Sequence, residues 1–282
     1  MLLEVFLNIC NSQNLAHLLG EMKIGHERIG FLPKRKQWQA IVLGLSEYEI
    51  GSSTTAKIAN DTLSCIQKSY EQMPYNESIS KAIKFLALIA VSAKQPDQLS
   101  FLKSNGCDIN DTISLYTLVD NAKGLITTDK GSLEVNKLAI DAVLQAMTIY
   151  QRDHTSNQLS FLSHQSEQVW ENVGSGAAFC ELARSFFASF TDRQIKYYVE
   201  RSAASAINDY AAMQSFTLGI THMTDAISHH AFETSKIMQS FAAGWFNKHV
   251  NTSIPSDKEV TDFLRISFKK MREEFRREAE KE

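Results

Sequence analysis

Three histidines and two acids are gathered in the stretch from 222 to 233, HMTDAISHHAFE. Four of their side chains recur every three or four residues, as they would on one face of a helix: His222, Asp225, His229 and Glu233. Imidazole and carboxylate groups that project from one helical face are common ligands of metal sites in helical bundles. The stretch therefore raises the hypothesis of a metal-dependent hydrolase whose site is built on these four side chains.

A metal site in a bundle also needs ligands from a second helix, and the best match is the set His164, Glu167 and Glu171. The order within this set is His-x-x-Glu, whereas di-iron bundle proteins use Glu-x-x-His with further glutamates. The set at 222–233 also lies away from the apolar stripe of its own helix, where a polar face is ordinarily solvated. The sequence thus favours a solvated or partner-facing surface over a metal centre, and no cofactor is expected.

One cluster combines basic side chains with an aromatic ring, and it consists of Lys34, Arg35, Lys36 and Trp38. Such a cluster can hold a phosphate or stack on a base, which makes nucleic-acid binding a further hypothesis. Consecutive charges after a proline are also typical of a solvated helix start. The formal net charge of −3 provides no overall field that attracts nucleic acid. Nucleic acid is therefore not the expected partner.

The composition indicates which elements would have to position these residues. Only 4 prolines and 12 glycines occur in 282 residues, and chains with many strands need more turn residues than that. Apolar residues recur at helical spacing in nearly every segment. Asn76, for example, is expected to cap a helix whose apolar face is Ile79, Ile83, Leu86 and Ala90. We therefore predict an all-α fold, either a multi-helix bundle or an irregular helical array.

A long helical region is predicted at about 191–250. The chain is rich in alanine, serine and glycine from residue 174 onward, and small residues let helix axes approach closely. Thr191-x-x-Gln194 is a candidate capping box that would open this region. The sequence Asn208-Asp209 and Gly219 are two candidate positions for a break in the helix.

The residues after Pro255 predict an amphipathic C-terminal helix. Ser256-x-x-Glu259 is a second candidate capping box, at the start of that helix. Because the last turns are almost entirely charged, we expect this end to project from the body and to find a partner helix. The predicted partner-binding residues are the large apolar side chains on one side of the helix: Phe263, Leu264, Met271 and Phe275.

The sequence also bears on domain organisation and location. A soft boundary near residue 151 separates a mixed helical half, 1–151, from a small-residue-rich half, 152–282, although the two halves could form one domain. The four cysteines include no C-x-x-C pair, which is typical of a reducing compartment. The first residues do not resemble a signal peptide, and the longest apolar run is too short to span a membrane. A cytoplasmic protein without a membrane partner is expected.

The favoured function is non-catalytic. The stretch that begins at His26 resembles the zincin motif H-E-x-x-H, but Gly30 stands where the second histidine ligand should be. No G-x-S-x-G motif occurs either. The leading interpretation is a helical scaffold, adaptor or regulatory subunit that binds another protein or a second copy of this chain. The metal-dependent hydrolase and the nucleic-acid binder are the alternatives.

Overall fold

The computed structural model of this chain describes residues 36–48, 54–67, 69–129, 132–155, 165–233, 236–250 and 253–279. For residues 36–38, 54, 56, 165–167, 225–233, 236–239 and 274–279, only the backbone is described. Every regular element within these ranges is a helix, and no strand occurs among them. The prediction of an all-α helical array is confirmed.

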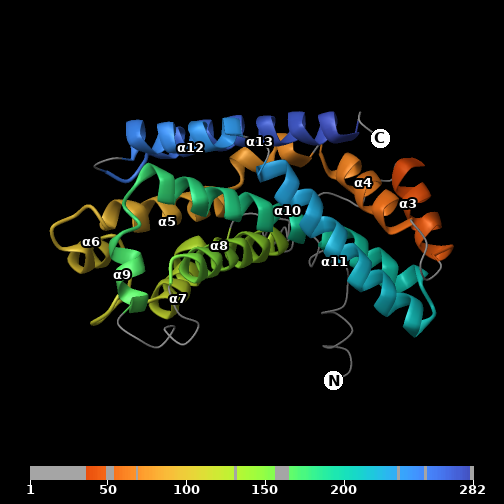
Figure 1. The fold of residues 1–282 in the computed structure, drawn as a ribbon, viewed down its shortest axis with the longest axis horizontal. Coiled ribbons are helices and arrows are strands. Elements are labelled where there is room, and N and C mark those ends of the chain that lie inside the picture. Colours follow the sequence, from red (N-terminus) through yellow and green to blue (C-terminus); the bar gives the residue numbers. More distant parts are fainter. Residues whose placement is uncertain are drawn as a thin grey trace, which may run out of the picture.

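The helices follow one another with short connections. In chain order they are α3 (Lys36–Ser46), α4 (Thr54–Ile66), the 3-10 helices η1 (Ser69–Glu71) and η2 (Met73–Tyr75), α5 (Glu77–Ser92), α6 (Gln98–Ser104), α7 (Leu115–Ile126), α8 (Leu133–Asp153), α9 (Gln165–Glu171), α10 (Gly176–Ala206), α11 (Tyr210–Glu233), α12 (Lys236–His249) and α13 (Asp257–Ala279). Figure 1 shows an elongated arrangement, with α3, α4 and α11 towards one end and α6 and α9 at the other.

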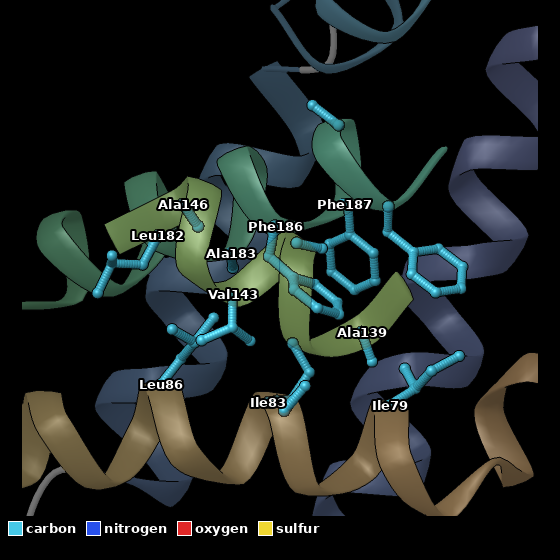
Figure 2. Close-up of a cluster of buried hydrophobic side chains, with 14 of the residues drawn as sticks. Ile79, Ile83, Leu86, Ala139, Val143, Ala146, Leu182, Ala183, Phe186 and Phe187 are labelled. Atoms are coloured by element: carbon cyan, nitrogen blue, oxygen red, sulfur yellow. The ribbon is translucent and has the colours of Figure 1, made fainter. Parts of the chain in front are cut away.

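Helix α5 begins where the sequence predicted. The Asn76 side chain accepts hydrogen bonds from the backbone N–H groups of Ser78 and Ile79, which is the role of an N-cap. All four residues of the predicted apolar face of α5 are fully buried. Figure 2 shows Ile79 and Ile83 of α5 beside apolar side chains of α8 and α10, so these three helices build the centre of the core.

The same buried cluster joins residues from both sides of the soft boundary near residue 151. The α5 and α8 residues of Figure 2 come from the first half of the chain, and Leu182, Ala183, Phe186 and Phe187 of α10 come from the second. Each of these four α10 side chains is at most 1% exposed. Packing of this kind couples the two halves, because neither can lose its apolar layer without exposing that of the other.

Helix α10 differs from its sequence-based prediction. It runs unbroken from Gly176 to Ala206, so Thr191 and Gln194 lie in its interior and do not form a capping box. Both side chains are fully buried, and each contacts η1: Tyr70 donates to Thr191 Oγ1, and Gln194 donates to Ser69 Oγ. A motif suited to a helix start is used here for tertiary hydrogen bonds. The predicted break at residues 208–209 is confirmed.

Small residues bring α10 and α12 into close contact, as the sequence indicated. A methyl group added at Gly176 would lie 2.9 Å from Oδ1 of Asn247 and 3.1 Å from the carbonyl oxygen of Ala243. Gly219 does not break α11, and a methyl group added there would lie 3.1 Å from Cγ2 of Thr55 on α4. Glycine at these two positions therefore serves close helix packing and not a change of chain direction.

Helix α13 begins at the predicted capping box. Ser256 Oγ accepts from the backbone N–H of Glu259, while Glu259 accepts from the backbone N–H and hydroxyl of Ser256. These bonds from Ser256, together with one from His249 at 2.9 Å, lower the pKa of Glu259 to about 2. In Figure 1, α13 lies along one long edge of the molecule.

The body of α13 is packed on the rest of the fold, which corrects the interpretation of its apolar side as a partner-binding surface. Phe263, Leu264 and Met271 are at most 2% exposed, so they are core residues of this fold and not an open surface for a partner. The ring centroid of Phe263 lies 4.5 Å from that of Trp245. The side chain of the fourth predicted residue, Phe275, lies outside the described part of the chain.

Among the described residues, no helix combines the length and the apolar character needed to cross a membrane. The three described cysteines, Cys65, Cys107 and Cys180, are buried, and Cys107 and Cys180 are free thiols. Burial raises the pKa of Cys107 to about 11 and also raises that of Cys180. Thiols of this kind pack as small apolar side chains and are poor nucleophiles.

Candidate partner-binding groove

Helices α8 and α10 lie side by side and antiparallel, and their contact positions two hollows on the surface. Ser132 caps the start of α8 by accepting from the backbone N–H of Val135, and Ser175 caps the start of α10 by accepting from that of Ala178. Because the helices run in opposite directions, the start of α8 faces the later turns of α10. One hollow lies at that end, and the other lies where α8 finishes beside the start of α10.

The first hollow, which we call the charged groove, has a volume of about 670 Å³. Helix α8 supplies one wall, α10 the facing wall, and α11 a single residue. The lining residues are Leu133, Glu134, Lys137, Leu138 and Asp141 from α8, Arg193, Lys196, Tyr197 and Glu200 from α10, and Thr221 from α11. The groove thus carries three acids, three bases and three large apolar or aromatic side chains.

The side chains that line the groove range from buried to exposed. Leu138 is buried at the floor, and most of the charged side chains are half-buried. Leu133 is 57% exposed at the rim, although it is a large apolar side chain. Lys137 and Thr221 are also exposed. The groove is therefore open along its length and is not an enclosed cavity.

The charges of the groove are only partly neutralised by the protein itself. Lys196 pairs with Asp192 one turn earlier on the same helix, with 2.8 Å between nitrogen and oxygen. Within the described residues, Lys137, Asp141, Arg193 and Glu200 form no ion pair at all. Arg193 donates its Nε–H to Ser189 Oγ, which is a neutral partner. Four charged groups therefore face the groove without an opposite charge in contact.

The pKa of Glu200 depends on its burial and on the charges near it. Burial raises the pKa of Glu200, the nearby Lys196 lowers it, and Asp192 raises it further. The net direction is upward, so the ionised carboxylate is less stable in the folded protein than in water. A positive group brought into the groove would oppose that shift. Perturbed carboxylates of this kind are concentrated at functional sites.

The second hollow, which we call the end cavity, has a volume of about 540 Å³ and is lined by residues of α8, α9 and α10. His154 stacks on Tyr150, with ring centroids 4.1 Å apart, and its Nδ1 donates to the carbonyl oxygen of Tyr150. Its Nε2 lies 3.4 Å from a carboxylate oxygen of Glu181. Burial, and to a smaller degree Glu181, raises the pKa of Tyr150 to about 12. His154 and Glu181 thus lie within reach of each other.

The histidine and acid stripe of the metal hypothesis lies on α11. His222 is exposed, and it follows Thr221, which lines the charged groove. Helix α11 also contains Asp225, His229 and Glu233, but their side chains lie outside the described part of the chain. In the described residues, no group of three or more metal-ligating side chains comes together.

The second half of that hypothesis lies on and before α9. His164 lies outside the described residues, as does the side chain of Glu167, and Glu171 is exposed. In Figure 1, α9 lies near one end of the molecule, and α11 runs from the middle towards the other end. The two helices therefore do not face each other across a common site.

The basic cluster of the nucleic-acid hypothesis falls mostly outside the described structure. Lys34 and Arg35 precede the first described residue. Lys36 and Trp38 belong to the first turn of α3, and their side chains are not among those described. That hypothesis remains a prediction from sequence.

Sequence reasoning did not identify the residues of the charged groove. A signal was present, because Glu134, Lys137 and Asp141 recur at intervals of three and four residues. Arg193, Lys196 and Glu200 do the same on the other wall. This spacing alone describes any charged helix face, and only the packing of α8 on α10 brings the two faces together.

No protein family, no curated protein and no solved structure is detectably similar to this chain. In the part of the chain that the structure describes, the charged groove combines a hollow shape with charged side chains that form no ion pair. Its properties provide the basis for a functional proposal.

Proposed function

We propose that this protein is a non-catalytic helical scaffold or adaptor that binds a segment of another protein in the charged groove. The observation that carries the proposal is the set of half-buried charges on the two facing walls that have no opposite charge in contact. Desolvating a charge without pairing it costs free energy, and the cost is recovered when a partner supplies the opposite charge. The groove is therefore more favourable when it is occupied.

The shape of the groove supports a protein segment as its occupant. Small ligands are usually held in pockets that cover most of their surface. This groove is open, and Leu133 exposes an apolar side chain at its rim, beside Tyr197 and the buried Leu138. Interfaces between proteins commonly place apolar and aromatic side chains at the centre with charges around them.

The proposal includes a cytoplasmic location. It is supported by the three described cysteines, which are all buried and of which Cys107 and Cys180 are free thiols. The fourth, Cys10, lies outside the described residues. Buried thiols without disulfides are the usual state in a reducing compartment.

Site-specific photo-crosslinking tests the proposal. A photoreactive residue is placed at Lys137 in the groove, in full-length protein produced in the cells from which the chain comes. The control places the same residue at Tyr116, which is 80% exposed on α7 and does not line the groove. The expected result is a discrete protein adduct from position 137 that is absent from position 116, with its identity read by mass spectrometry. Equal labelling at both positions, or none at either, would refute the proposal.

A further inference from the structure

The end cavity contains a buried hydroxyl group without a hydrogen-bond partner in the protein. The Tyr150 side chain is only 6% exposed, and its ring packs against those of His154 and Trp170. Tyr150 lines the cavity, yet within the described residues its hydroxyl forms no hydrogen bond. A buried polar group without a partner costs free energy, and a buried tyrosine hydroxyl usually has one. A ligand in the cavity would supply the missing partner.

Two hydrogen-bond acceptors face each other beside this hydroxyl. The Nδ1–H of His154 donates to the carbonyl oxygen of Tyr150 at 2.9 Å, so Nδ1 carries the proton when the ring is neutral. Nε2 then has only a lone pair, and it lies 3.4 Å from a carboxylate oxygen of Glu181, which also only accepts. The pair is satisfied by a second proton on the ring or by a donor from outside. A ligand with N–H groups supplies such a donor.

The start of α10 offers a donor to the same cavity. Ser175, Ala177 and Ala178 all contribute to the lining. The side chain of Ser175 accepts from the N–H of Ala178, whereas the N–H of Ala177 has no hydrogen-bond partner in the part of the chain that the structure describes. A free N–H in the first turn of a 31-residue helix, together with the helix dipole, favours a carboxylate or another anion.

The donor and the acid are about one helical turn apart. Glu181 follows Ala177 by four residues, which corresponds to about 6 Å along the axis at roughly 1.5 Å per residue. Side chains on a helix lean towards its N-terminus, so the Glu181 carboxylate leans towards the start of α10. An α-amino acid carries its ammonium and carboxylate groups on one carbon atom, and with a hydrogen bond of about 2.9 Å at each end it can bridge this separation.

We propose that the end cavity binds a free α-amino acid, at a site separate from the charged groove. The carboxylate of the ligand accepts from the N–H of Ala177. Its ammonium group donates to Glu181 and to Nε2 of His154, which fills the place between the two acceptors. The Tyr150 hydroxyl gains a hydrogen-bond partner from the ligand. A simple carboxylate would be repelled by Glu181, and a simple amine would leave Ala177 without an acceptor.

The rest of the cavity restricts the side chain of the ligand. The volume of about 540 Å³ is within the range of small-molecule pockets and accommodates an amino acid. Apart from His154 and Glu181, every lining residue is uncharged, and Gln168 and Asn172 are polar. An amino acid with an uncharged side chain should therefore bind more tightly than lysine, arginine, aspartate or glutamate.

Isothermal titration calorimetry on the full-length protein, with each proteinogenic amino acid in turn, tests this inference. The amino acid that binds most tightly is then compared with two of its derivatives. Its carboxamide lacks the negative charge, and its N-acetyl form lacks the positive charge. Each derivative should bind at least about tenfold more weakly than the parent, because each loses a charge-assisted hydrogen bond.

Two substitutions assign the two ends of the ligand. Glu181→Gln removes the acid, so it should weaken binding of the amino acid at least about tenfold without weakening binding of the N-acetyl form. Ala177→Pro removes one N–H and no charge, at a position in the first turn where proline is tolerated. It should weaken the amino acid without weakening the carboxamide. Thermal melting establishes that each variant is folded.

Glu47→Gln is the matched control. It makes the same chemical change as Glu181→Gln at an exposed residue after α3, outside the cavity, and should leave every affinity unchanged. Absence of binding by every amino acid at millimolar concentration would overturn the inference, as would equal losses in Glu181→Gln and Glu47→Gln. A carboxamide that binds as tightly as its parent would assign the cavity to an amine instead, and an equally tight N-acetyl form would assign it to a carboxylate.

Discussion

The clearest test of the fold concerns Phe263, because the sequence placed it on a partner-binding surface and the structure places it in the core. Its ring centroid lies 4.5 Å from that of Trp245 and 5.5 Å from that of Phe241, and the side chain is fully buried. Replacing a fully buried phenylalanine by alanine costs about 3–5 kcal/mol. Domains are stable by only about 5–15 kcal/mol, so Phe263→Ala should remove a large fraction of the stability.

Deletion of the helix enlarges the same effect. Five large apolar side chains of α13 are at most 2% exposed: Val260, Phe263, Leu264, Phe268 and Met271. At about 1.5–3 kcal/mol each, their burial contributes roughly 7–15 kcal/mol, which is comparable to the whole stability of a domain. A chain ending at residue 256 should therefore fail to fold cooperatively. If the apolar side of α13 were instead a partner-binding surface, the same deletion would leave a folded body.

Urea unfolding followed by circular dichroism at 222 nm provides the measurement. Phe263→Ala should lower the midpoint with an unchanged slope, since the slope reports the surface exposed on unfolding. Arg265→Ala is the matched control on the same helix, because Arg265 is exposed and its one ion pair among the described residues is with Asp262, three residues earlier. Its effect should stay within about 0.5 kcal/mol. Equal small effects of both substitutions, or a cooperative transition in the chain ending at 256, would refute the docking of α13.

Three further predictions concern single residues. Gly176→Ala should destabilise the protein by about 1–3 kcal/mol, because the new methyl group meets Asn247 and the α12 backbone. Gly244→Ala should stabilise it by about 0.5–1 kcal/mol, because its methyl group enters open space. Thermal melting of both variants distinguishes the two cases. The raised pKa of Glu200 makes its ionisation unfavourable in the fold, so the stability of the protein falls as pH rises through that pKa. Glu200→Gln should abolish this fall and slightly raise the melting temperature at neutral pH. The same variant should weaken capture of the partner. The pKa of Glu259, lowered to about 2, contributes stability that is lost as pH falls from the ordinary carboxyl range towards 2, so a pH series of urea midpoints should show a smaller acid loss in Glu259→Gln.

Helix starts were the most predictable part of the fold, because a cap is a local device. Asn76 and Ser256 each act within three residues, and both caps form as the sequence indicated. Thr191 and Gln194 show the limit of such reasoning. They form the same kind of pattern, but they lie in the middle of α10. Their side chains form hydrogen bonds with η1, which is more than 120 residues away in sequence.

The distinction between a core face and a binding face could not be made from sequence. The apolar side of α13 has the composition of either, and only the aromatic side chains of α10 and α12 packed against Phe263 decide between them. For the charged groove, the sequence did not distinguish a binding face from an ordinary solvated face. Its walls are separated by more than 50 residues in the chain, and each wall alone resembles an ordinary solvated helix face.

The packing of α8 on α10 determines where the charges of the groove lie. Four of these charges, Lys137, Asp141, Arg193 and Glu200, form no ion pair within the described residues. The apolar layer shown in Figure 2 holds the helices in the observed register, because interlocked side chains such as Phe187 cannot move one turn without opening voids. The apolar side chains of the interior therefore favour this packing, whereas the charges of the groove do not stabilise it. A sequence that paired these charges within the protein would be more stable, but its groove would no longer attract a charged partner.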